Sequence, residues 1–170
     1  MAAGSTYSTI ATTTLGSDIA SYTFSSIGGT YTDLILIGQF GQSTGGNAIA
    51  VQFNSDTGTN YSFTALVGSG TAASSTRVSN SNYLYPAYNI APSSAIAGVL
   101  KMNIQNYSNT TTNKSVLIRY DNNDATYPGT STTVGLWRST SAITSIKIEA
   151  FGGTGLKTNS TFTLYGITCA

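Results

Sequence analysis

Short runs of alternating apolar and polar residues recur along the whole chain, and they constrain its fold more than any other feature. In the segment NAIAVQFN, for example, Ile49, Val51 and Phe53 fall on one side. Successive side chains of a strand point to opposite faces, so a period of two is typical of a half-buried strand. No 3.6-residue pattern persists for three turns. The alternation therefore predicts an all-β protein.

The alternating runs are separated by turns rich in Gly, Asn, Asp and Ser. The predicted strands are Tyr7–Leu15, Ser21–Ile27, Tyr31–Phe40, Ala48–Asn54, Tyr61–Val67, Tyr83–Ile90, Ile96–Tyr107, Lys114–Tyr120, Thr133–Ser139, Ile143–Phe151 and Thr161–Thr168. Strands spaced about 8–12 residues apart favour a sandwich or a barrel, and a double-sheet jelly roll has about eight of them. We predict an antiparallel, jelly-roll-like β-sandwich of about 8–11 strands, with residues 1–20 as an N-terminal strand or arm and residues 21–170 as one domain.

The composition excludes several classes of function. Charged residues make up 8% of the chain, the net charge is +1, and the basic residues are scattered. Nucleic-acid recognition needs clustered Lys and Arg, so we expect no nucleic-acid partner. No apolar run approaches about 18 residues, so we expect no membrane span. Long, weakly charged strand edges invite association, and we expect the protein to bury such surfaces in an assembly.

The chemistry of an enzyme is largely missing. The chain has no His and only one Cys, Cys169. This removes most general-base arrangements, Ser-His-Asp and Cys-His nucleophile systems, and most transition-metal sites. The six acidic residues show no spacing that suggests a catalytic pair. We therefore predict no catalytic residues, no cofactor and no enzymatic activity.

Two Asx-rich segments are weak candidates for a Ca²⁺ site, because hard cations take carboxylate and carbonyl oxygens. They are Asn54–Asn60, with Asp56, and Asp121–Ala125, with Asp121 and Asp124. Neither matches the EF-hand loop. Asn and Asp also gather in turns for conformational reasons alone. The prediction is therefore no metal site, with these three Asp residues as the residual candidates.

A run of tyrosines, NYLYPAYN, stands out between residues 82 and 89. It contains Tyr83, Tyr85 and Tyr88. Tyr is enriched in protein interfaces because it combines a large area with a polar tip. Exposed aromatic rings also stack on sugars. The three tyrosines are therefore candidates for an interface or a glycan site, and the interface or core reading is favoured.

Three residues are predicted to anchor the core of the sandwich. Trp137 is a large apolar residue with one hydrogen-bond donor to satisfy. Phe162 and Leu164 fall on the same side of the last predicted strand.

Three stretches of the sequence carry a pattern found together in one group of proteins. They are SYTFSSIGGTYTDLILIGQ at Ser21–Gln39, IQNYSNTTTNKSVLIRY at Ile104–Tyr120 followed by VGLWRSTSAITSIKI at Val134–Ile148, and STFTLYGITCA at Ser160–Ala170. In this order they resemble the small virion structural proteins of tailed bacteriophages. The match runs from about Ser21 to the end and is weakest in Gly68–Ile96. Cys169 departs from the group, whose members tend to carry small or basic residues there.

The resemblance implies a jelly-roll-like sandwich, a homotrimer, and a place on the virion. It favours a capsid cement or decoration protein on the capsid surface, with the major capsid protein and further copies of itself as partners. The alternative is a tail-fibre or receptor-binding module, with tail proteins or host surface glycans as partners. A depolymerase-type enzyme is the weakest reading, because His and paired acids are missing.

Overall fold

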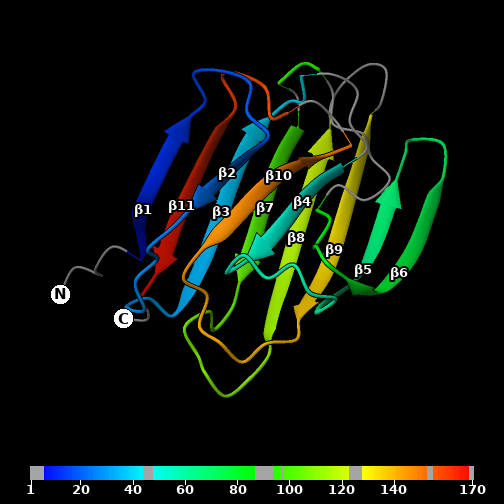
Figure 1. The fold of residues 1–170 in the computed structure, drawn as a ribbon. Helices are drawn as coiled ribbons and strands as arrows, with labels where there is room; N and C mark the ends of the chain where they lie inside the picture. Colours follow the sequence, from blue (N-terminus) through cyan, green and yellow to red (C-terminus); the bar gives the residue numbers. More distant parts are fainter. Residues whose placement is uncertain are drawn as a thin grey trace.

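The computed structural model describes residues 6–43, 48–86, 94–96, 98–122, 128–152 and 155–168. This part of the chain forms eleven strands and contains no helix that could span a membrane (Figure 1). The strands are β1 (Tyr7–Thr14), β2 (Ser21–Phe24), β3 (Asp33–Phe40), β4 (Ala48–Phe53), β5 (Tyr61–Gly68), β6 (Ala73–Ser81), β7 (Gly98–Ile104), β8 (Lys114–Asn122), β9 (Gly129–Trp137), β10 (Ile146–Phe151) and β11 (Thr161–Ile167).

The strands form two antiparallel sheets of unequal size. The larger sheet has eight strands in the order β1-β11-β3-β7-β8-β9-β5-β6, and the smaller has three in the order β2-β10-β4. In Figure 1 the small sheet lies in front of the middle of the large one. The predicted all-β sandwich is confirmed, and its eleven strands fall within the predicted range.

The chain passes from one sheet to the other at six of its connections. These are the connections β1–β2, β2–β3, β3–β4, β4–β5, β9–β10 and β10–β11. A chain that passes repeatedly between two antiparallel sheets is typical of a jelly-roll-like sandwich. The middle of the chain behaves differently, because β5 to β9 all stay in the large sheet.

Both terminal strands lie at the same edge of the large sheet. β1 pairs with β11 from Tyr7↔Ile167 to Thr14↔Thr161, and β11 pairs on its other side with β3. The last strand is therefore held by two ladders, which explains how a strand so close to the end of the sequence stays ordered. β1, predicted as a strand or arm, is an integral edge strand of the main sheet (Figure 1).

Two strand predictions need correction. β6 was not predicted, because its sequence ASSTRVSNS lacks a run of alternating large apolar residues and most of its side chains are exposed. The predicted strand at Tyr83–Ile90 is described only up to residue 86. There it makes a single bridge, between Leu84 and Val51 of β4. Pro86 lacks the backbone N–H that a continuing ladder would need.

The core lies between the two sheets and is built from the inward side chains of both. Phe40 of β3 stacks between Tyr120 of β8 and Phe162 of β11, with ring centroids 5.7 and 5.9 Å apart. Ile146 and Ile148 of β10 are fully buried on the opposite side of the sandwich. Burying each large apolar side chain contributes about 1.5–3 kcal/mol, so this layer is the main source of stability.

The three stretches that carry the sequence resemblance meet at one corner of the large sheet. The hydroxyl of Tyr107 donates to the carbonyl of Gly28 and accepts from the backbone N–H of Tyr31. A carboxylate oxygen of Asp33 accepts the backbone N–H of Asn106 at 2.7 Å. The stretches therefore share a structural role: they fasten the entry to β3 against the turn that follows β7.

The third stretch joins this corner through Gly166 of β11. The ring of Tyr31 covers Gly166 so closely that an added Cβ would lie 2.3 Å from the ring Cγ atom. The approaching atoms are at the base of the ring, so a small side-chain movement does not relieve the contact. Only Gly fits at this position.

We predict that Gly166→Ala lowers the free energy of unfolding by about 1–3 kcal/mol, the usual cost of overpacking. Urea denaturation measures the effect. Gly16→Ala is the matched control, because an added Cβ there meets no atom within 4 Å. In the background Tyr31→Ala, the additional cost of Gly166→Ala should largely disappear. Equal costs in both backgrounds would show that the ring of Tyr31 is not the obstacle.

Candidate functional site

The face of the large sheet that points away from the small sheet carries most of the exposed apolar side chains of the described chain. Side chains on β7, β8 and β9 alternate strictly between the buried core and this face. Partners across the ladder share a face, as Leu117 does with Asn103 and Val134. Six large apolar residues on it are 41–59% exposed: Tyr7, Ile37, Leu66, Val99, Leu117 and Val134. We call this surface the outer face.

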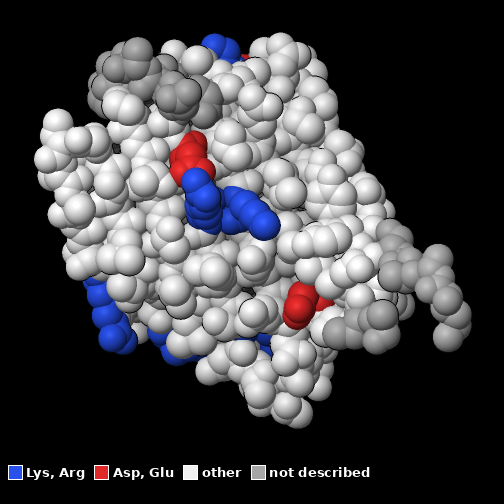
Figure 2. Space-filling model, turned by 180° about the vertical axis from the view of Figure 1, so that it is seen from behind, with Lys and Arg blue, Asp and Glu red and all other residues white. Residues whose placement is uncertain are grey.

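The outer face carries few charged side chains. Figure 2 shows one compact group of basic and acidic side chains on it, a separate acidic group toward the lower right and basic side chains toward the lower left. Lys101 of β7 lies directly across the ladder from Arg119 of β8, and Asp121 follows on β8. The Nε atom of Arg119 is 3.0 Å from a carboxylate oxygen of Asp121. One carboxylate therefore pairs with one of two neighbouring cations.

Shallow hollows open on the same face. One of them, about 530 Å³, lies where β9, β5 and β6 run side by side, and its lining is aliphatic and hydroxyl-bearing: Leu66, Val67, Gly68, Ala73, Ser74, Ser75, Thr130 and Thr132. Nothing in this lining can act as a nucleophile paired with a base. Across the described ranges no three His, Cys, Asp or Glu side chains come together to hold a metal ion.

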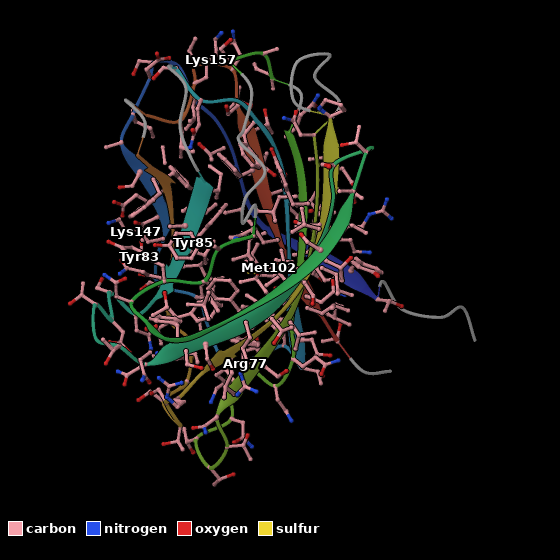
Figure 3. The ribbon with its side chains drawn as sticks, turned by 90° about the vertical axis from the view of Figure 1, so that its right-hand side faces the viewer. Arg77, Tyr83, Tyr85, Met102, Lys147 and Lys157 are labelled. Atoms are coloured by element: carbon pink, nitrogen blue, oxygen red, sulfur yellow. The ribbon has the colours of Figure 1, made fainter. Side chains whose placement is uncertain are left out.

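An aromatic cluster lies beside the small sheet. The rings of Tyr83 and Tyr85 are 5.9 Å apart, and both lie within 6 Å of the ring of Phe151 at the end of β10, at 5.9 and 5.4 Å. Figure 3 shows Tyr83 and Tyr85 on the same side of the molecule as Lys147. Phe151 is 41% exposed. The structure thus brings two of the three predicted tyrosines together, and Tyr88 lies outside the described residues.

Asp56, a weak metal candidate, has a structural role. Its carboxylate accepts hydrogen bonds from the indole Nε1 of Trp137 at 2.7 Å, from the backbone N–H of Gly58 at 2.8 Å and from the amide of Asn60 at 2.9 Å. Burial tends to raise the pKa of this carboxyl, but the hydrogen bonds from Trp137, Asn60 and Gly58 outweigh it and hold the pKa below its usual value. Both oxygens are therefore engaged by protein donors.

Of the other two metal candidates, the structure describes only Asp121. Asp121 pairs with Arg119 and accepts a hydrogen bond from the hydroxyl of Thr130 at 2.5 Å. Asp124 lies outside the described residues. The second Asx-rich segment therefore contributes to the charge group of the outer face through Asp121.

The structure places all three predicted anchors in the core. Trp137 is 2% exposed and stacks on Tyr61, with ring centroids 6.3 Å apart, while Phe53 packs 5.6 Å away. Its single donor is satisfied by Asp56. Phe162 and Leu164 are fully buried.

Sequence reasoning missed the outer face. Its residues come from strands far apart in the sequence, so no single motif contains them. One signal was present, however: pairs such as Val99-Leu100 and Leu117-Ile118 put apolar residues on both sides of one strand. Strands that are covered on both faces read in this way.

No protein-family model matches this sequence, and no curated protein matches it. The function of the outer face therefore has to be argued from its own geometry and chemistry.

The Trp137–Asp56 hydrogen bond should couple the two side chains in a pH-dependent way. Since the folded-state pKa of Asp56 is lowered, the stabilisation is present above the usual pKa of 3.8 and is lost as the pH falls through the folded-state value. A double-mutant cycle with Trp137→Phe and Asp56→Asn should give a coupling of about 1–2 kcal/mol at neutral pH, allowing for partial exposure.

The same cycle repeated at decreasing pH below 3.8 should give a falling coupling, because the carboxylate becomes protonated as the pH passes through its lowered folded-state pKa. Thermal or urea unfolding at each pH provides the measurement. A coupling that is absent at neutral pH, or unchanged in acid, would refute the role given to this hydrogen bond.

Proposed function

We propose that this protein is a non-enzymatic structural protein of a bacteriophage virion, most simply a capsid cement or decoration protein that binds and stabilises the outer shell as an oligomer. The observation that carries the proposal is the outer face. It places six exposed apolar side chains on one side of an antiparallel sheet. Such a surface is suited to packing against the surface of another protein.

The physical argument rests on what an isolated sandwich needs. An antiparallel sheet with one face on the core usually presents polar side chains to water on the other face. Monomeric proteins rarely expose contiguous apolar patches beyond a few hundred Å². The six exposed apolar side chains of the outer face depart from this pattern, which supports an assembly role.

The resemblance noted in the sequence supports the virion as the place of assembly. Its three stretches build the corner that holds β3, β7 and β11 together. This common structural role supports a fold shared with those virion proteins. On that basis we propose that the chain also shares their homotrimeric state and their place on the shell. On this proposal the partners are further copies of the chain and the major capsid protein.

A second candidate function is a tail-fibre or receptor-binding module that recognises host surface glycans. The aromatic cluster of Tyr83, Tyr85 and Phe151 favours it, because partly exposed rings can stack on a sugar. The rings are tilted or edge-on to one another rather than coplanar. The three rings therefore do not form one flat surface on which a sugar could stack; they present separate ring edges and the exposed ring of Phe151.

Copy number in purified particles tests the first proposal. Quantitative mass spectrometry, scaled to the major capsid protein, should give a ratio near one copy, or one trimer, per few shell subunits. A few tens of copies per particle would place the protein on the tail. Absence from the particle would contradict a virion role altogether.

A glycan array tests the second candidate. If the aromatic cluster binds sugars, Tyr83→Ala should abolish the signal of a positive glycan, while Tyr7→Ala on the outer face should leave it unchanged. Both variants remove one tyrosine ring, so loss with only the first assigns the site. No signal from the unmodified protein at high concentration would rule the glycan function out.

A further inference from the structure

We infer that the outer face packs against the outer face of a second copy of the chain, about a two-fold axis that crosses β8 between Arg119 and Asp121. The inference rests on the proposed function in one respect: it takes the outer face as the assembly surface and names its partner. Size, charge and shape of the face each point to a second copy.

The size of the face fits a standard interface. Its eight strands are seven to nine residues long. With strands about 4.8 Å apart and about 3.3 Å per residue, its footprint is roughly 800 Å². A stable interface takes about that area from each partner. A second copy of the same face covers it completely, since the two footprints are identical.

The charge group is unbalanced in a single chain. Like charges directly across a ladder destabilise a sheet, and Lys101 and Arg119 are such a pair. Only one carboxylate, Asp121, contacts Arg119. In a dimer, each Arg119 can face the Asp121 of the second copy as well as its own, so that two Arg and two Asp side chains alternate in sign.

A two-fold axis perpendicular to the strands gives this arrangement. Arg119 and Asp121 lie two residues apart on β8, on the same face. A two-fold rotation about an axis that passes between them reverses the direction of β8. Arg119 of each copy then faces Asp121 of the other. The contact then contains two reciprocal ion pairs at its centre, on strands in the middle of the sheet. The strands of the two sheets run nearly aligned, as in common face-to-face packing.

The same operation matches shape on β5. Leu66, the most exposed of the six apolar residues at 59%, lies two residues from Gly68 on the same strand. Through β9, Leu66 lies in register with Arg119, and Gly68 lies in register with Asp121. The axis that places Arg119 opposite Asp121 of the other copy therefore also places Leu66 opposite Gly68. Leu66 of each copy therefore meets the groove beside Gly68 of the other. An isologous contact of this kind joins two chains, or two of the proposed trimers, face to face, and therefore predicts species with an even number of chains.

Reversal of the charges tests the contact. Arg119→Asp and Asp121→Arg should each weaken self-association, by roughly tenfold for each of the two reversed pairs and about a hundredfold in all. An equimolar mixture of the two variants should associate again, as heterodimers in which both pairs are complementary. Native mass spectrometry resolves the species, and sedimentation equilibrium gives the dissociation constants.

Lys147→Asp is the matched control, because it makes the same change of charge on β10 of the small sheet, away from the outer face. It should leave association unchanged, and the melting temperatures of all three variants should stay close to that of the unmodified protein because the exposed pair contributes little to folding. The inference would be overturned if the protein at high concentration were a monomer or contained an odd number of chains. It would also be overturned if neither charge reversal weakened association, or if the mixed variants failed to associate. Particle copy number does not depend on this contact, so the proposed function can fail or stand separately.

Discussion

Cross-strand register decides which face each side chain of the large sheet occupies, because successive residues of a strand point to opposite sides. The small sheet covers only one of these faces, so the same register that places Phe40 and Tyr120 in the core places Leu117 and Val134 on the outside. A slip of one residue would exchange the two sets. Core and outer face are thus two consequences of one pairing scheme, and neither can change without the other.

The register is held by side-chain contacts between segments that are distant in sequence. Tyr107 and Gly166 lock the corner around Tyr31, and the Trp137–Asp56 hydrogen bond ties the end of β9 to the turn after β4. These contacts lie at the ends of the sheets and leave the middle of the outer face untouched. A surface that is held rigid at its ends loses little conformational entropy when it binds a partner.

Much of this fold could be predicted from the sequence, because a period of two is a local property. The strand β6 could not, since its side chains are largely solvated and leave no apolar alternation. The outer face was also beyond reach. Val99 and Leu117 become neighbours of one surface only after the strand order is known, and the pattern does not say which face the small sheet covers. The partner of Trp137 was unpredictable because Asp56 lies in a turn whose Asx residues have several possible roles.

Self-burial of the outer face is the central claim, and side-chain footprinting in solution tests it most directly. Hydroxyl-radical oxidation is measured by mass spectrometry over a dilution series. The account predicts that oxidation of Leu117 and Val134 rises as the protein is diluted, while oxidation of Phe151, on the other side of the sandwich, stays constant. Equal oxidation of Leu117 and Val134 at every concentration would show that no second copy covers the outer face.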